Sequence, residues 1–149
     1  MQIKAILVAT DFSQDADAAI DAAIDIAKKF GSKLEIFHAY YVDVPAIYAG
    51  FGNDYVMPQD VLDPISEAAQ ASMDALLERV SGHGVEVSGR VEMERPVKAI
   101  LGESERILAD LIVMGTRGLS GFEHLVLGST ADRVIRMAKC PVMTVRTKS

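Results

Sequence analysis

Hydrophobic residues in this chain gather in short runs that alternate with longer segments of mixed character. The runs have the length of β-strands and are rich in aliphatic residues, which is typical of strands buried on both faces. Five such runs lie at residues 3–9, 33–40, 85–93, 110–115 and 141–146. The pattern therefore predicts five short strands separated by segments long enough for helices.

The segment after the first run has the spacing of an amphipathic helix. Its apolar stripe is formed by Ile20, Ala23, Ile24, Ala27 and Phe30. Asp17, Asp21 and Asp25 fall on another face, where we expect them to be solvated rather than to hold a metal. We predict that this helix packs its apolar stripe on the sheet.

Start and stop signals indicate three further helices. Asp63 is suited to cap the second helix and Pro64 to occupy its first turn, and a glycine turn at residues 82–84 ends it. Apolar residues recur within it at helical spacing, at Ile65, Ala69, Met73, Leu76 and Val80. A third helix is predicted to begin near Pro96, and a fourth to follow Gly128.

Strands that alternate with helices predict an α/β fold. Because each parallel strand pair needs a crossover helix, we expect an open, mostly parallel five-stranded sheet with helices on both faces, of the Rossmann-like type. The 149 residues are predicted to form a single domain, residues 1–149. Such sheets bind ligands beyond the carboxyl ends of their strands, so the site is expected just after Ala9, Tyr40 and Met114.

One connection is longer than the roughly two to six residues that are usual in such folds. It runs from Tyr41 to Leu62 and contains Tyr48, Phe51 and Tyr55. We interpret the aromatic residues as anchors that pack this excursion at the edge of a pocket or of a subunit contact.

Composition narrows the class of ligand. The formal net charge is -6 and no cluster of Lys and Arg is present, which argues against binding the phosphate backbone of a nucleic acid. No apolar run approaches the roughly 20 residues of a membrane span, and a single cysteine fits a reducing compartment. We expect a cytoplasmic protein without a nucleic-acid or membrane partner. A small anion remains compatible, because helix N-termini bind phosphate locally.

The first candidate site is the segment ATDFS, residues 9–13, where the chain leaves the first predicted strand. Asp11 is able to accept hydrogen bonds from a ribose hydroxyl or an adenine amine, or to help place a divalent ion. Alternatively, Asp11 or Ser13 caps the helix that follows, with Asp15 and Asp17 favouring its positive end. The residues alone leave both interpretations open.

The second candidate site is the glycine-rich stretch VMGTRGLSGFEHLVLGST, residues 113–130. Gly115, Gly118 and Gly128 allow backbone N–H groups to approach an anion closely. A helix that starts near Ser129 would direct its free N–H groups and its dipole at phosphates. A mobile connection with a serine cap explains the same residues equally well. The P-loop, the dinucleotide-binding fingerprint and the serine hydrolase elbow are absent from the sequence.

Three stretches together resemble the universal stress protein family. They are ILVATDFS near the start, then DLIVMGTRGLSGFEHLVLGST, and finally CPVMTVR. The family pattern Gly-x2-Gly-x9-Gly-Ser/Thr is matched in full by Gly115, Gly118, Gly128 and Ser129. In the family this pattern marks the members that bind ATP or AMP. The resemblance therefore implies the adenine-nucleotide-binding type of the fold.

The resemblance also implies where a nucleotide would lie. Adenine and ribose are expected between the ends of the first two strands and beside the fourth, near Thr10, Asp11, Ala39, Met114 and Gly115. The phosphates are expected at Gly118, Gly128, Ser129 and Thr130. Arg117 lies inside the glycine-rich stretch, and we expect it to add a charge-assisted phosphate contact.

The chain departs from the family pattern before the third helix, where Glu94 stands in place of a frequent glycine. An acid there disfavours a long phosphate tail, so we expect AMP or ADP to compete well with ATP. Mg²⁺ or Mn²⁺ would accompany the nucleotide, with Asp11 as the residue suited to help place it. No other metal site is predicted.

The resemblance further implies a homodimer in which the last strand, from Pro141 to Arg146, pairs with its twofold mate. An apolar edge strand agrees with this, because it offers unpaired backbone groups. No general base is evident near the phosphates, so we predict a stress-response sensor or regulator with an unidentified protein partner and at most slow ATP hydrolysis. A nucleotide-independent dimeric interaction module is the alternative.

Overall fold

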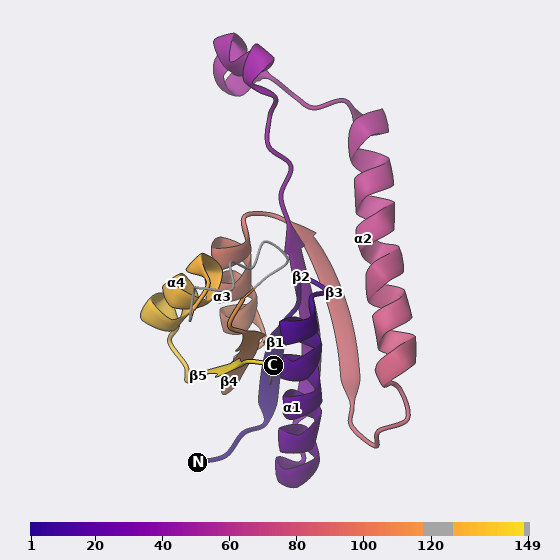
Figure 1. Cartoon of the computed structure of the whole chain (residues 1–149), viewed down its shortest axis with the longest axis vertical. Coiled ribbons are helices and arrows are strands. Elements are labelled where there is room, and N and C mark those ends of the chain that lie inside the picture. Colours follow the sequence, from indigo (N-terminus) through magenta and orange to yellow (C-terminus); the bar gives the residue numbers. More distant parts are fainter. Residues whose placement is uncertain (118–126, 148–149) are drawn as a thin grey trace.

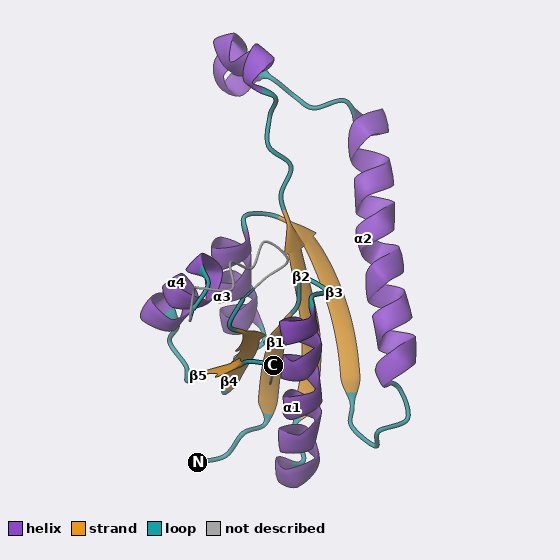
Figure 2. Cartoon of the chain, in the orientation of Figure 1, coloured by secondary structure: helices purple, strands orange, loops and turns teal. Residues whose placement is uncertain are grey.

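The computed structural model describes residues 1–117 and 127–147, apart from the side chains at positions 51 and 53. Strands and helices alternate along the chain, as Figure 2 shows. The elements are β1 (Ala5–Ala9), α1 (Gln14–Phe30), β2 (Lys33–Tyr40), η1 (Ala46–Asp54), α2 (Gln59–Val80), β3 (Val87–Met93), α3 (Pro96–Arg106), β4 (Leu111–Gly115), α4 (Ser129–Met137) and β5 (Val142–Val145). Each of the five predicted strands is present, and the four predicted helices lie between the expected strands.

The five strands form one parallel sheet in the order β3-β2-β1-β4-β5. The chain runs outward from β1 through β2 to β3, and then returns to place β4 on the other side of β1. The switch point therefore lies between β1 and β4, where Ala9 is in register with Met114. The predicted α/β class and Rossmann-like sheet are confirmed.

Helices cover both faces of the sheet, as Figure 1 shows. α1 and α2 pack on the face that carries Ile6 and Val8, whereas α3 and α4 pack on the face that carries Leu7 and Phe37. Successive residues of β1 thus enter two different cores, and all four of these side chains are fully buried. This two-sided burial explains why the strands are continuous apolar runs rather than alternating ones.

α1 begins and ends with favourable caps. Ser13 is its N-cap, with the side-chain oxygen accepting a hydrogen bond from the N–H of Ala16 at 3.3 Å, and Gly31 ends the helix in the left-handed conformation. The predicted apolar stripe is buried except at Phe30, which is 48% exposed because the helix ends at that residue. The stripe therefore packs on the sheet as predicted, except for its last residue, Phe30.

The predicted start of α2 is wrong by about one turn. The helix begins at Gln59, so Asp63 and Pro64 lie inside it. Asp63 accepts a hydrogen bond from the Gln59 side chain at 2.5 Å instead of capping the helix. Pro64 is tolerated because it lies close to the N-terminus, where its missing N–H removes one intrahelical bond and leaves the rest of the helix intact.

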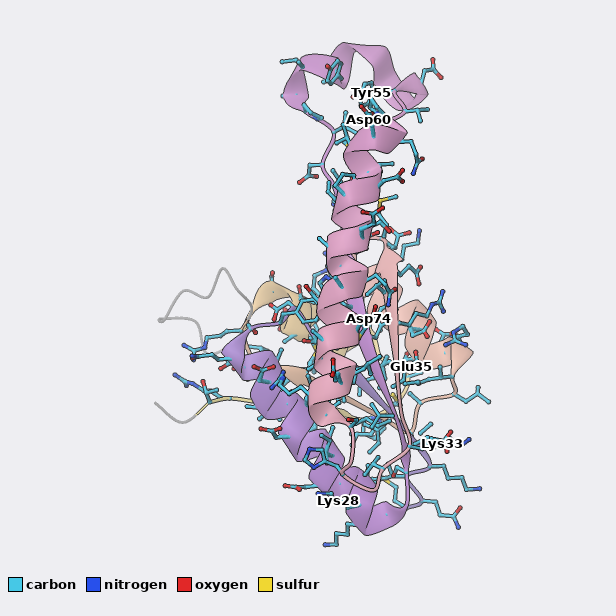
Figure 3. All side chains as sticks on the ribbon, turned by 90° about the vertical axis from the view of Figure 1, so that its right-hand side faces the viewer. Lys28, Lys33, Glu35, Tyr55, Asp60 and Asp74 are labelled. Carbon is cyan, nitrogen blue, oxygen red and sulfur yellow. The ribbon has the colours of Figure 1, made fainter. Side chains whose placement is uncertain are left out.

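The predicted place of the long connection, at the edge of a pocket or of a subunit contact, stays a prediction. Figure 1 shows η1 beyond the end of β2, and Figure 3 places Tyr55 and Asp60 at the far end of α2, away from Glu35 in the sheet. Tyr48 and Tyr55 stack with 4.3 Å between their ring centroids, while Ile47 is 80% exposed. The stacked rings link η1 to the residue that follows it.

A charged cluster lies between β2, β3 and α3. The Glu103 carboxylate is only 2% exposed and accepts hydrogen bonds from Arg90 at 2.7 Å and from Arg106. Arg106 also pairs with Glu35 at 3.2 Å. Burial and the neighbouring Glu103 raise the pKa of Glu35 to about 7, against the opposing charge of Arg106. The folded protein therefore holds a carboxyl group that titrates near neutral pH.

Candidate functional site

The turn between β1 and α1 is shaped by its own side chains. Thr10 Oγ1 accepts a hydrogen bond from the backbone N–H of Phe12 at 3.0 Å, and the Asp11 carboxylate accepts one from that of Ser13 at 3.0 Å. These bonds hold Phe12 at φ 63°, a left-handed conformation that residues other than glycine rarely adopt. Ser13 is thus the helix cap, and Asp11 shapes the turn from a half-buried position at the sheet edge.

His38 of β2 fixes the same turn from the neighbouring strand. Its Nδ1 lies 2.8 Å from the carbonyl oxygen of Thr10, and because a carbonyl only accepts, this nitrogen carries the proton. The rings of Phe12 and His38 lie 4.6 Å apart between centroids. The sequence analysis missed this contact because the two bonded residues are 28 positions apart and carry no local signal.

The ends of β2 and β4 flank this turn. Ala9 is in register with Phe37 on one side and with Met114 on the other. Met114 is 5% exposed, and Ala39 packs half-buried against the same core cluster. The sheet therefore brings the residues predicted to surround the nucleoside to one edge.

Gly115 ends β4 directly against the first turn of α1. A Cβ atom at this position would lie 2.9 Å from the backbone carbonyl carbon of Asp15 and 3.1 Å from the backbone nitrogen of Ala16. Real Cβ atoms essentially never lie within 3.0 Å of another atom in this way, so no other residue fits at position 115 without a shift. Close helix packing accounts for this glycine, whereas the sequence pattern had suggested access for an anion.

Gly128 holds the start of α4 against the end of β4. Its N–H donates to the carbonyl oxygen of Thr116, and a Cβ would lie 3.1 Å from that oxygen. Asp132 donates the first intrahelical bond to the Gly128 carbonyl, so the N–H groups of Ser129 and Thr130 have no acceptor within the helix. The predicted helix start near Ser129 is confirmed. This helix end is suited to bind an anion.

Arg117 and Gly118 begin the glycine-rich connection. Arg117 is paired with a buried acid, because its Nε lies 3.3 Å from Oδ2 of Asp15. A contact between Arg117 and a phosphate stays a prediction. Gly118 lies outside the described residues, so its predicted role stays a prediction as well.

Glu94 is held at the start of α3. Its carboxylate pairs with Lys98 at 2.8 Å and accepts a hydrogen bond from the backbone N–H of Arg95 at 2.8 Å. The bonds from Lys98 and Arg95 lower the pKa of Glu94. The acid that was expected to disfavour a long phosphate tail is therefore ionised and carries a counter-ion.

Asp11, the candidate metal ligand, does not belong to a metal-binding cluster among the described residues. Within residues 1–117 and 127–147, no group of three or more His, Cys, Asp or Glu side chains is arranged to hold a metal ion. Mg²⁺ commonly binds proteins through one or two carboxylates together with phosphates and water. A role of Asp11 in placing a divalent ion stays a prediction.

The site joins two features of different chemistry at one edge of the sheet. The acidic β1–α1 turn follows the central strand, and the N-terminus of α4 is bonded to the end of the adjacent strand through Thr116. The chain is therefore an α/β protein with an open parallel sheet, and the helix N-terminus at its switch point marks the edge where such sheets hold their ligands.

Comparison with known proteins specifies the family. The model of the universal stress protein family matches residues 2–146, and the chain belongs to this family. A universal stress protein of Methanocaldococcus jannaschii is 34% identical over 144 residues, which are 96% of this chain and 82% of that protein. Universal stress protein YxiE of Bacillus subtilis is 31% identical over 144 residues, 94% of this chain and 97% of that protein.

Solved structures share the fold. A hypothetical protein from a structural-genomics test case superposes with a TM-score of 0.83 at 23% identity, covering 100% of this chain and 99% of its own. A universal stress protein in complex with cAMP has a TM-score of 0.72 at 26% identity and covers 99% and 100% of the two chains. A universal stress protein of Archaeoglobus fulgidus in complex with dAMP has a TM-score of 0.66 at 21% identity and covers 97% and 99%.

Proposed function

We propose that this universal stress protein binds an adenine nucleotide between the ends of β1 and β4 and acts in the cytoplasm as a sensor or regulator. The observation that carries the proposal is the N-terminus of α4, whose N–H groups at Ser129 and Thr130 have no acceptor within the helix. The polar turn at Thr10 and Asp11 lies at the same edge of the sheet. The structural neighbours in complex with cAMP and dAMP support an adenine nucleotide as the ligand.

The residues divide between the two halves of such a ligand. Adenine and ribose lie near Thr10, Asp11, Ala39, Met114 and Gly115 in this proposal. The phosphates lie at Gly118, Gly128, Ser129 and Thr130, with Arg117 as an additional cation. The N–H of Gly128 already donates to Thr116, so the phosphate contacts come chiefly from the N–H groups and hydroxyls of the two residues that follow.

The proposed role is binding rather than dedicated catalysis. We expect ATP hydrolysis to be slow at most, with Mg²⁺ or Mn²⁺ bound between the phosphates and Asp11. Glu94, which pairs with Lys98, is expected to disfavour a long phosphate tail. AMP and ADP should therefore compete well with ATP for the site. Among the described residues, no helix combines the length and the apolar character that crossing a membrane requires.

Gly128→Val is expected to weaken ATP binding by at least about tenfold, or 1.4 kcal/mol. The branched side chain would enter the space beside the Thr116 carbonyl, where a Cβ alone would already lie at 3.1 Å, and would push α4 from the phosphates. Gly50→Val is the matched control, because an added Cβ there has no atom of the described part of the chain within 4 Å. Equal affinity of both variants in titration calorimetry would speak against the proposed phosphate site.

We also propose a homodimer formed by β5. This strand ends the sheet, so within the described residues one of its edges has no partner strand. The Pro141 carbonyl accepts a hydrogen bond from the N–H of Ile112 in β4, and the Val145 carbonyl accepts one from Thr116, directly after β4. The backbone groups of Val142 and Thr144 therefore face outward. An outward edge of this kind is suited to pair with a second copy.

Thr144→Pro is therefore expected to convert the dimer into a monomer. Proline removes the outward N–H of residue 144. The hydrogen bonds that the Pro141 and Val145 carbonyls accept stay in place. Light scattering after size exclusion measures the mass. A wild-type protein that is monomeric at micromolar concentration would contradict the dimer, and a dimeric Thr144→Pro variant would place the interface elsewhere.

A further inference from the structure

Asp15 is a buried acid in the first turn of α1 that receives hydrogen bonds from two distant parts of the chain. The residue is 5% exposed. Its Oδ2 accepts from the Thr116 hydroxyl at 3.1 Å and from Arg117 Nε at 3.3 Å. Its Oδ1 accepts from the backbone N–H of Thr147 at 3.2 Å and from the Thr147 hydroxyl at 2.5 Å. One side chain thus binds the chain after β4 and the chain after β5.

The hydrogen bonds to Asp15 explain how this carboxylate carries a charge although it is buried. Burial would raise the pKa of Asp15, but the hydrogen bonds from Thr147, Arg117 and Thr116 outweigh burial and lower it. The carboxylate is therefore ionised at neutral pH, and an ionised carboxylate only accepts. All four donors must face it, which sets the orientation of each donor side chain.

The bonds continue from Asp15 to the helix end proposed to bind phosphate. Thr116 donates its hydroxyl to Asp15 and accepts the N–H of Gly128 on its carbonyl oxygen. Gly128 in turn accepts the first intrahelical bond of α4. A continuous path of hydrogen bonds therefore runs from Thr147, after β5, through Asp15 and Thr116 to the N-terminus of α4.

The backbone of Asp15 adds a steric constraint to the same place. It lies so close to Gly115 that a Cβ there would be 2.9 Å away. The end of β4 is thus pressed against α1 and bonded to it through one residue. Asp17, two positions further along α1, pairs with Arg79 of α2 at the surface instead. Within the described residues, Asp15 contacts Thr116 and Arg117 at the start of the connection to α4, whereas the Asp17 side chain bonds to Arg79.

We propose that Asp15 is a positioning residue for the phosphate end of the nucleotide site, holding the start of the glycine-rich connection in place and tying it to the chain after β5. The inference rests on the proposed nucleotide-binding function. Asp15 touches no phosphate in this account and acts through Thr116, Arg117 and Gly128. A consequence is that a change at Thr147, beyond the last strand, alters phosphate binding.

The test compares ATP with adenosine in titration calorimetry for wild type, Asp15→Asn, Thr147→Val and the control Asp17→Asn. A positioning role predicts that Asp15→Asn loses about tenfold in ATP affinity while adenosine affinity is unchanged, within the usual range of coupling between sites. Thr147→Val should also lose ATP affinity, by a smaller factor than Asp15→Asn. Asp17→Asn should bind both ligands as the wild type does. General destabilisation would weaken both ligands alike, and an unchanged ratio of ATP to adenosine affinity would overturn the inference.

Amide hydrogen exchange provides a readout that needs no ligand. The Gly128 N–H should exchange faster in Asp15→Asn and in Thr147→Val than in wild type, because its acceptor on Thr116 is less firmly held, and should not change in Asp17→Asn. Unchanged Gly128 exchange in both variants overturns the inference whether or not a nucleotide binds. If wild type binds no nucleotide, the proposed function fails, and the exchange rates alone decide whether Asp15 holds this connection.

Discussion

Gly115→Ala should lower the free energy of unfolding by about 1–3 kcal/mol, the usual cost of inserting an atom into a packed interior. The added Cβ would lie 2.9 Å from backbone and side-chain carbon atoms of Asp15. Backbone atoms at the start of a helix cannot rotate away as the tip of a side chain can, so α1 or β4 must move. Chemical denaturation with urea measures the loss.

Gly102→Ala is the matched control for this substitution. Gly102 lies inside α3, and an added Cβ there meets no atom of the described residues within 4 Å. Alanine in a helix should raise the free energy of unfolding by about 0.4–1 kcal/mol, because it reduces the freedom of the unfolded chain. If both alanine variants proved equally stable, close packing of α1 on β4 would not explain the glycine at 115.

We expect the wild-type protein to lose stability as the pH rises from about 4.5 to 7, and we expect Glu35→Gln to abolish this loss. The pKa of Glu35 is raised from 4.5 to about 7 by burial and by Glu103. Between these values the folded protein keeps a proton that the unfolded chain releases. The free energy of unfolding therefore falls as pH rises through this window, by on the order of 3 kcal/mol at about 1.4 kcal/mol per unit of pKa.

Glutamine resembles the protonated form of Glu35 at every pH, so the variant should show a flat profile and exceed the wild type in stability at pH 8. Glu86→Gln is the control, since Glu86 pairs with Lys33 at the surface and its side chain is 70% exposed. The lowered pKa of Glu103 acts only in more acidic solution, where stability is lost as pH falls through that pKa. A wild-type profile that rises from pH 5 to 8 would refute the assignment.

Much of the fold was predictable because two-sided burial leaves a strong record in the sequence. Ile6, Leu7 and Val8 point into two cores, and a strand covered on both faces must be apolar at every position. The start of α2 was predicted wrongly because Asp63 followed by Pro64 matches a capping signal but lies in the second turn of the helix. The aromatic residues of the long connection do not indicate on their own what they pack against, since Tyr48 and Tyr55 stack on each other.

The site was predictable only in part. The alternation of strands and helices indicates which edge of the sheet holds a ligand, and the glycine pattern indicates the start of α4 at Ser129. Asp15 was predicted only to favour the positive end of the helix, as part of the capping interpretation of residues 9–13. Its partners Thr116 and Thr147 lie 101 and 132 residues away, so no local pattern could have shown that it is buried between them.

The structural role of Gly115 could not be predicted from the glycine pattern. The family pattern includes this glycine among residues of a nucleotide site, whereas the structure explains it by the contact with Asp15. A residue in a binding pattern can therefore be required by the packing that builds the site rather than by the ligand. The substitutions at Gly115 and Gly128 separate these roles, because the first is expected to act on stability and the second on affinity.

Titration calorimetry of the wild-type protein with ATP tests the central claim most directly. We predict heat that saturates at a single site between β1 and β4, displacement of ATP by ADP and AMP, and loss of that heat in Gly128→Val. No heat and no competition at millimolar nucleotide would contradict the account, and would leave the N-terminus of α4 without the ligand that we propose for it.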